Sequence, residues 1–175
     1  SRGLGDVYKR QIYGITVFGL AERLEISRDE AKKLIEGYFE NFPKVKEYMD
    51  KSIQMARANG YAETLFHRRR YLADINSHNA TVRGFAERNA INAPIQGTAA
   101  DIIKVAMINV YRRFRKEGIK SKMILQVHDE LDFECPIDEV ERLTTMVRDV
   151  MEHVVDLRVP LIAEASTGIT WADAK

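Results

Sequence analysis

Two acidic residues stand side by side within the segment QVHDELDFE, which runs from Gln126 to Glu134. Asp129 and Glu130 separate two short alternating patterns, so we expect them at the tip of a hairpin. A turn optimised only for stability would carry Asn-Gly or Asp-Gly, because adjacent carboxylates repel each other and add no packing. Mg²⁺ prefers one or two carboxylates completed by water and phosphate oxygens. The pair therefore indicates a magnesium site, with an exposed polar hairpin tip as the alternative.

A second group of side chains follows a helical spacing. At 100° per residue, positions i, i+4 and i+8 drift by only about 80°, so they share one face over roughly 12 Å of helix. The residues with this spacing are Arg88, Asn92 and Gln96. All three donate hydrogen bonds, and the DNA minor groove presents acceptors at similar positions for every base pair. The row indicates sequence-independent contact with a duplex; a solvated polar helix face is the alternative.

A third group is the arginine run Arg68, Arg69 and Arg70, which Tyr71 follows. Three consecutive guanidinium groups alternate sides on an extended segment, so a small domain is not expected to pair all of them internally. Arginine forks match phosphate oxygens, which makes phosphate contact their natural use. The alternative is an ordinary exposed arginine run.

Charge is unevenly distributed along the chain, although the net charge is only +1. Residues 57–122 hold 13 Lys and Arg against 5 Asp and Glu, a net of +8, whereas residues 123–175 hold 4 against 12, a net of −8. A basic segment followed by an acidic one can place phosphate-binding cations beside metal-binding carboxylates. Two solvated faces of opposite sign are the other interpretation.

Composition excludes several classes of protein. The length of 175 residues, 45% of them hydrophobic, fits one compact domain or slightly more. No apolar stretch approaches the roughly 18 residues that a membrane span needs. The single Cys135 excludes an intramolecular disulfide and fits a reducing compartment. Glycine-rich phosphate loops, dinucleotide fingerprints and serine-hydrolase elbows are absent from the sequence.

The first third of the chain is expected to be helical. A helical pattern starts at Ile12, and Ser27 with Glu30 forms a capping box that begins a second helix. Pro43 suits the first turn of a third helix, which Gly60 would end in a left-handed conformation.

The remainder predicts short strands alternating with helices. We expect two short strands around the basic loop in residues 61–74 and a long helix over 81–116, with a kink or break at Pro94. The hairpin strands should run over 123–127 and from Leu131 to Cys135. A helix capped by Asp138 and Glu141 and a last strand over 157–165 would follow. The predicted fold class is mixed α+β.

Taken together, ERNAINAPIQGTAADIIKVAMI and QVHDELDFE resemble the C-terminal polymerase region of family A DNA polymerases, the bacterial DNA polymerase I type. IYGITVFGLAERL is similar to the end of that family's fingers motif, and TLFHRRRYLADINS to its basic β-loop. The resemblance extends from about Ile12 to the C-terminus. Single-subunit RNA polymerases share the His-Asp pair, but Glu130 and the QGTAAD segment favour a DNA polymerase.

The resemblance implies roles for the acidic hairpin. Asp129 resembles the motif C aspartate of the palm, which binds both catalytic Mg²⁺ ions. Glu130 is similar to its acidic neighbour, which supports the metal site less directly. Gln126 and His128 resemble residues that line the primer terminus. The implied reaction is two-metal nucleotidyl transfer from a dNTP to the primer 3′-hydroxyl.

The resemblance also implies DNA contacts. Arg68 and Arg69 match basic residues that touch the DNA backbone. Tyr13 resembles the aromatic residue that stacks at the template position, and Gly14 matches the glycine after it. The positions that match the family's minor-groove contacts are Arg88, Asn92 and Gln96. The implied partners are primer–template DNA and dNTP, with no membrane, for a monomer in the cytoplasm of a bacterium or a phage-infected cell.

Two departures from the family pattern affect what the chain can do. The family grips the incoming triphosphate with Arg, Lys and an aromatic residue at four-residue spacing, where this chain has Ser1, Gly5 and Lys9. Residues 1–11 are therefore expected to be a non-native leader, and the missing starting Met suggests a fragment. The motif A aspartate of the palm has no counterpart here.

The predicted organisation is a leader over 1–11, a helical fingers remnant over 12–60, and a palm region over 61–175. The palm region would hold the motif C hairpin in a small antiparallel sheet with packed helices. The predicted function is part of a template-directed DNA polymerase in replication or repair, inactive alone. A non-catalytic nucleic-acid-binding module derived from a polymerase palm is the alternative.

Overall fold

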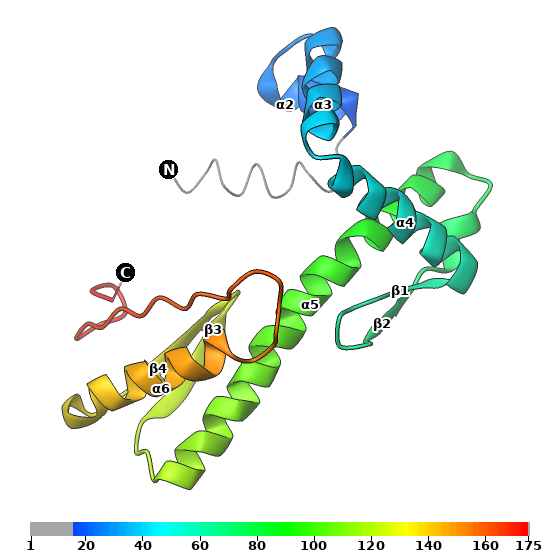
Figure 1. Ribbon diagram of the computed structural model, residues 1–175. Helices are drawn as coiled ribbons and strands as arrows, with labels where there is room; N and C mark the ends of the chain where they lie inside the picture. Colours follow the sequence, from blue (N-terminus) through cyan, green and yellow to red (C-terminus); the bar gives the residue numbers. More distant parts are fainter. Residues whose placement is uncertain (1–15, 175) are drawn as a thin grey trace. The chain divides into compact units, whose positions relative to one another are not determined.

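The computed structural model describes residues 16–174 (Figure 1). The chain folds into two compact units, and the first ends at Thr98. Helices dominate and the strands form two small antiparallel pairs, which confirms the predicted α+β class. The elements in chain order are α2 Val17–Leu24, α3 Arg28–Asn41, α4 Pro43–Asn59, β1 Tyr61–Glu63, β2 Arg69–Tyr71, η1 Ala73–Asn76, α5 Ala80–Glu117, β3 Lys122–Val127, β4 Glu130–Glu134, η2 Ile137–Glu139 and α6 Val140–Glu152.

The first unit begins with three helices whose ends follow local sequence rules. The Ser27 hydroxyl accepts from the Glu30 amide, and the Glu30 carboxylate accepts from the Ser27 amide, so the predicted capping box is confirmed. Pro43 occupies the first turn of α4, and Gly60 ends that helix with φ of 78°. Leu20, Ala21 and Ala31 form a small core between α2 and α3.

The β1–β2 hairpin packs against the adjacent helices of the first unit. Tyr61 pairs with Tyr71 and Glu63 with Arg69, as predicted for two short strands around a basic loop. The apolar residues that bury the hairpin against α4, η1 and α5 are Ala56, Ala62, Leu72, Ile75, Ala86 and Ala90. The Tyr48 hydroxyl of α4 also donates to the Ile91 carbonyl of α5 at 3.0 Å.

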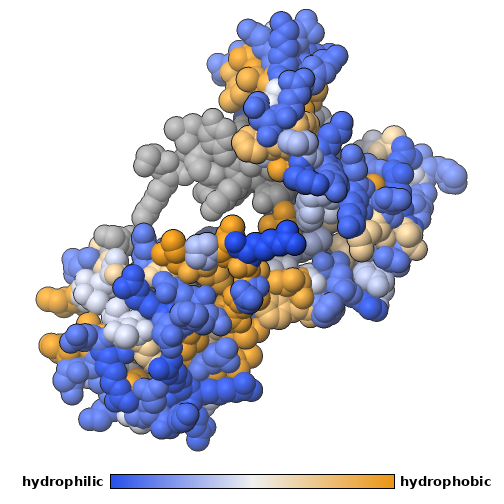
Figure 2. Space-filling model, in the orientation of Figure 1, coloured by the Kyte–Doolittle hydropathy of each residue, from blue (hydrophilic) through white to orange (hydrophobic). Residues whose placement is uncertain are grey.

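The second unit packs a two-stranded sheet against helices. Val110 and Phe114 of α5 meet the apolar stripe of α6, and Met123 of β3 and Phe133 of β4 complete this core. The buried stripe residues of α6 are Leu143, Met146, Val147 and Val150. Figure 2 shows that other apolar side chains of this unit stay open to solvent, and Ile137 and Ile162 are 94% and 76% exposed. Across residues 16–174, no helix is long and apolar enough to cross a bilayer.

Three expectations about elements need correction. Helix α5 continues through Pro94, so the break that was expected there as one of two outcomes is wrong, and the other outcome, a kink, stays a prediction. The helix after β4 is not capped by Asp138 and Glu141, because a 3₁₀ turn precedes α6 and its N-cap residue makes no side-chain cap bond. Residues 157–165 form no strand, because no neighbouring strand in the described part of the chain supplies the partner that an alternating pattern needs. The two units meet between Thr98 and Ala99 and not at residue 60, where the fingers remnant was expected to end. The assignment of residues 12–60 to the fingers and 61–175 to the palm stays a prediction.

Helix α5 and the β1–β2 loop approach each other closely at Gly97. A Cβ on Gly97 would lie 2.6 Å from the Thr64 Cγ2 atom and 3.2 Å from the Arg68 Nη2 atom. Thr64 is buried, so its methyl group cannot move away freely. This position in α5 therefore requires glycine.

We expect Gly97→Ala to lower the free energy of unfolding of the first unit by about 1–2 kcal/mol, because overpacking outweighs the gain in helix propensity. Gly37→Ala is the matched control, since a Cβ on Gly37 of α3 would have no other atom within 4 Å. That control should raise stability by about 0.5–1 kcal/mol. Urea unfolding followed by circular dichroism measures both changes, and equal effects of the two substitutions would contradict the close approach.

Candidate functional site

The acidic pair lies at the tip of the β3–β4 hairpin. Val127 pairs with Glu130, so the turn consists of His128 and Asp129, and Glu130 begins β4 rather than lying in the turn. His128 has φ of 55°, the left-handed conformation that two-residue hairpin turns require at their first position. A residue other than glycine is strained there by about 1–3 kcal/mol. The conformation directs the backbone at Asp129 out of the sheet.

The carboxylates of the tip are free to bind a ligand. Asp129 and Glu130 are exposed, and neither carboxylate makes a hydrogen bond or ion pair with another residue in the described part of the chain. Gln126 instead supports the turn, because its Nε2 atom donates to the His128 carbonyl at 2.6 Å. Two uncommitted carboxylates suit Mg²⁺, which keeps several water or phosphate ligands. Residues 16–174 hold no group of three or more potential metal ligands, so these two would supply only part of a coordination shell.

One further acidic residue of this hairpin was missed in the sequence analysis. Glu130, Asp132 and Glu134 occupy alternate positions of β4, so they share the face opposite Leu131 and Phe133. The Asp132 Oδ2 atom is buried without a hydrogen-bond partner in the described residues. Lys122 pairs with Glu134 at 4.0 Å, which offsets only part of the negative charge. The period-two alternation of acids was the signal that could have revealed this face.

The Glu139 carboxylate anchors the opposite end of the hairpin. It accepts hydrogen bonds from the Lys120 and Ser121 amides at 3.0 Å and from the Ser121 hydroxyl at 2.7 Å. The Ser121 hydroxyl bond, followed by the Lys120 amide, lowers the pKa of Glu139 below its ordinary value of 4.5. The start of β3 is thereby tied to the 3₁₀ turn that leads into α6.

The stability of the second unit should therefore depend on the charge of Glu139. A lowered pKa in the folded state means that the carboxylate stabilises the fold above pH 4.5 and that this contribution disappears as pH falls through the lowered value. We expect Glu139→Gln to lower the melting temperature near pH 7, with a difference from the parent that shrinks in acid. Thermal unfolding across this pH range measures it. Glu141→Gln, at an exposed position of α6, is the control and should show no such pH-dependent difference.

The helix-face residues occupy one turn after another of α5 in the first unit. Arg88 and Gln96 are exposed, whereas Asn92 is half-buried and its Oδ1 atom is buried without a hydrogen-bond partner in the described residues. The Arg88 guanidinium lies 5.9 Å from the centre of the Phe85 ring. The predicted spacing on one continuous helix is confirmed, and contact with DNA stays a prediction.

Two arginines of the basic loop already have partners within the first unit. The Arg68 Nη2 atom donates to the Gly97 carbonyl at 3.0 Å, and the Arg68 amide donates to the Thr64 hydroxyl. The Arg69 Nε atom donates to the Glu63 carboxylate at 2.8 Å, and this hydrogen bond raises the pKa of Arg69. The hydrogen bond with His67, followed by that with Arg69, lowers the pKa of Glu63. Their contact with the DNA backbone stays a prediction.

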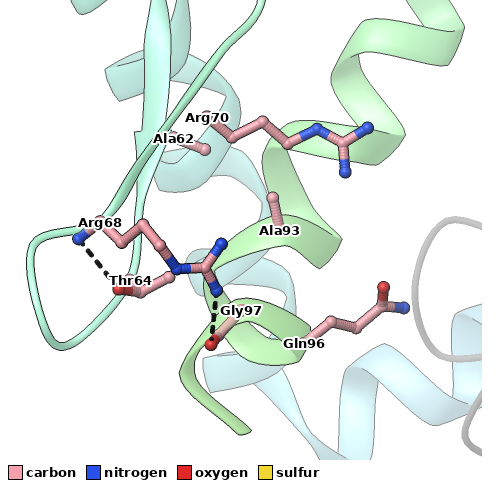
Figure 3. A pocket seen from close by; sticks show the side chains of 7 residues that line it. All are labelled: Ala62, Thr64, Arg68, Arg70, Ala93, Gln96 and Gly97. Atoms are coloured by element: carbon pink, nitrogen blue, oxygen red, sulfur yellow. Dashed lines mark hydrogen bonds between the residues drawn. The ribbon is translucent and has the colours of Figure 1, made fainter. Parts of the chain in front are cut away.

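A small pocket of about 170 Å³ lies between this loop and α5 (Figure 3). Arg68, Arg70 and Gln96 contribute the long polar side chains, and no acidic residue lines it. The smaller lining residues are Ala62, Thr64, Ala93 and Gly97. The pocket brings the arginine run and the helix face together, which the sequence analysis had treated separately.

The predicted site residues fall into two groups, one in each unit. Gln126, His128, Asp129 and Glu130 share the hairpin of the second unit, whereas the arginine run and the α5 face belong to the first. In the first unit, Arg68 and Gln96 line the same pocket. Tyr13 and Gly14, with the expected leader and its Lys9, lie outside the described residues.

Comparison with known proteins identifies the family. Residues 9–173 match the model of DNA polymerase family A. The chain is 56% identical over 164 residues to DNA polymerase I of Geobacillus stearothermophilus and 53% identical to that of Streptococcus pneumoniae TIGR4, covering 94% of this chain and 19% of each relative. A solved structure, the POL domain of Pol1 from M. smegmatis in complex with DNA primer-template and dNTP, matches with a TM-score of 0.95 and 44% identity. That match covers 99% of this chain and 30% of the other.

The chain therefore belongs to DNA polymerase family A, as the sequence motifs suggested. It spans about a fifth of the length of the curated relatives that it matches.

Proposed function

We propose that this chain is the C-terminal part of the polymerase region of a template-directed DNA polymerase. The observation that carries the proposal is the hairpin tip, where the carboxylates of Asp129 and Glu130 are exposed and have no partner in the described residues. Two adjacent carboxylates repel each other and add no packing, so a bound cation is the use that fits them, next to a residue, His128, held in the left-handed conformation. The likeness of nearly the whole chain to a POL domain in complex with primer-template and dNTP supports the same conclusion.

In this proposal the hairpin residues divide the work at the metal site. Asp129 would hold the metal ions, and Glu130 would add charge beside it from the first position of β4. Bound Mg²⁺ supplies Lewis-acid activation of the primer hydroxyl and charge neutralisation at the phosphates. The Gln126 side chain donates to the His128 carbonyl and would thereby stabilise the turn that carries His128 and Asp129. The substrates would be dNTP and a primer 3′-hydroxyl.

The first unit would hold the duplex. Arg88 and Gln96 are exposed hydrogen-bond donors about two turns apart on α5, and Asn92 lies on the turn between them. Minor-groove acceptors recur at nearly fixed positions for all base pairs, so such a row grips DNA without reading its sequence. The basic loop beside α5 would contribute contact with the sugar–phosphate backbone. We propose a monomer acting in the cytoplasm of a bacterium or a phage-infected cell, since the relatives named above are bacterial.

A non-catalytic duplex-binding module is the second candidate function. It is favoured by the small number of metal ligands, because residues 16–174 offer no group of three or more potential ligands. Under this alternative the α5 face and the basic loop would act, and the hairpin would be only a polar tip. Primer extension separates the two candidates.

The catalytic proposal is tested in a chimera in which residues 12–175 replace the matching segment of the Geobacillus stearothermophilus DNA polymerase I. We expect the chimera to extend a primer. Asp129→Ala should lower the extension rate by about a thousandfold or more, because several kcal/mol of metal-dependent stabilisation is lost, while duplex affinity changes little.

Asp138→Ala serves as the matched control, since Asp138 is an exposed acid outside the hairpin tip, in η2. It should extend the primer at the parent rate. The 175-residue chain alone should extend no primer, because it supplies only part of the metal site. An active Asp129→Ala chimera would sink the assignment of the metal ligand.

The duplex-binding proposal makes a separate prediction. Arg88→Ala and Gln96→Ala should each weaken primer–template affinity by about 1–3 kcal/mol or less, to a similar extent across template sequences. Fluorescence anisotropy with several labelled duplexes gives the affinities. Asn89→Ala is the control, because the Asn89 amide already donates to the Phe85 carbonyl within α5. Losses confined to one template sequence would argue against a minor-groove grip.

A further inference from the structure

The side chains of Arg68, Arg69 and Arg70 lie on two different faces of the β1–β2 hairpin. Successive residues of a strand point to opposite sides, so Arg69 shares a face with Tyr71, while Arg68 and Arg70 share the other. The observed register places Arg69 opposite Glu63 and Arg70 opposite Ala62. The two faces therefore offer the arginines very different surroundings.

The face that carries Arg69 is neutralised within the hairpin. Its guanidinium bonds Glu63 and lies over the Tyr61 ring, 4.5 Å from the ring centre. The His67 Nδ1 atom lies 2.8 Å from the other oxygen of the same carboxylate. The Glu63 carboxylate therefore offsets the charge of Arg69 and occupies its Nε donor, so a phosphate gains less from Arg69 than from an unpaired guanidinium.

The opposite face is joined to helix α5 by Arg68. Its guanidinium donates to the Gly97 carbonyl, and the Thr98 hydroxyl accepts from the Leu65 amide at 3.0 Å. The Thr64 hydroxyl, which is buried, accepts from the Arg68 amide at 3.1 Å. These bonds connect the loop to the helical turn that follows Gln96, so Arg68 acts mainly as a positioning residue.

Arg70 differs from both of its neighbours. No hydrogen bond or ion pair joins its side chain to another residue of the 16–174 part of the chain, and it is exposed. Its stem passes the small residues Ala62 and Ala93 of the pocket, and Figure 3 shows Arg70 and Gln96 extending toward the same side. The pocket is thus lined by cationic and amide donors without an acid.

Such a lining is suited to a tetrahedral anion. A guanidinium fork matches phosphate oxygens, and no carboxylate lines the pocket to repel an anion. One liquid water fills about 30 Å³, so a pocket of about 170 Å³ has room for a phosphate group that keeps part of its hydration. Gln96 also belongs to the α5 face with Arg88 and Asn92. An anion bound in the pocket would therefore lie adjacent to the proposed duplex-binding face.

We propose that Arg70 binds one backbone phosphate of the DNA duplex at this pocket, next to the minor-groove contact proposed for Gln96, while Arg68 holds the loop in place. The proposal rests on the proposed function and deepens it, since it assigns the phosphate contact of the basic loop to one residue. It also gives a use for Arg70, whose guanidinium makes no hydrogen bond or ion pair in the described residues while Arg68 and Arg69 do.

The test measures how salt affects duplex binding by the 175-residue chain and its variants. Anisotropy of a labelled primer–template duplex between about 50 and 200 mM NaCl gives the slope of log K against log salt, and loss of one phosphate contact lowers that slope by about 0.9. Arg70→Ala should therefore lose about three- to fourfold more affinity at the low-salt end of this range than at the high-salt end, relative to the parent chain. Arg70→Lys should restore most of the slope, because it keeps the charge.

Arg28→Ala is the matched control, since Arg28 is an exposed arginine of the same unit at the start of α3. Its slope should equal that of the parent chain. An unchanged slope in Arg70→Ala, or an equal fall in Arg28→Ala, would overturn the assignment to Arg70 and leave the proposed function standing. A parent chain that binds no duplex at any of these salt concentrations would overturn the phosphate site and the proposed duplex grip together.

Discussion

The close approach of the β1–β2 loop to helix α5 at Gly97 is the constraint on which the candidate nucleic-acid face depends. A glycine inside a helix costs about 1 kcal/mol relative to alanine, so local propensity does not favour it. Its lack of a side chain lets Thr64 pack against the helix and lets Arg68 reach the Gly97 carbonyl. Gln96, the exposed residue before Gly97, lies next to this contact, and both residues line the pocket between the loop and α5.

Much of the helical part of the fold could be predicted from the sequence because its signals are local. The capping box at Ser27, Pro43 in a first turn and the left-handed Gly60 each act within four residues. Predictions failed where the outcome depends on distant partners. Residues 157–165 alternate correctly but meet no neighbouring strand in the described chain, and a 3₁₀ turn stands where Asp138 and Glu141 were expected to cap a helix.

The sequence predicted which residue types form the candidate site, but it did not predict which of these side chains already have partners within the fold. Adjacent acids at 129 and 130 and the four-residue spacing on α5 were recognisable because hairpins and helices impose fixed periods. The partners of Arg68 and Arg69 were not, since a carbonyl of α5 and a carboxylate across the hairpin become neighbours only after folding. Asp132 was missed for another reason, because two adjacent acids at a turn are a stronger local signal than single acids alternating along a strand.

The β3–β4 sheet has a consequence for the chain as an isolated polypeptide. Within the described residues it has two strands, so each strand is also an edge with unpaired backbone groups. Ile124, displaced by the irregular register, and Leu125 are 60% and 47% exposed on β3. Open edges with exposed aliphatic residues invite intermolecular β-pairing and aggregation, which the acidic face of β4 opposes by repulsion. The carboxylates around the proposed metal site thus also act as gatekeepers of solubility, and neutralising them would remove both properties at once.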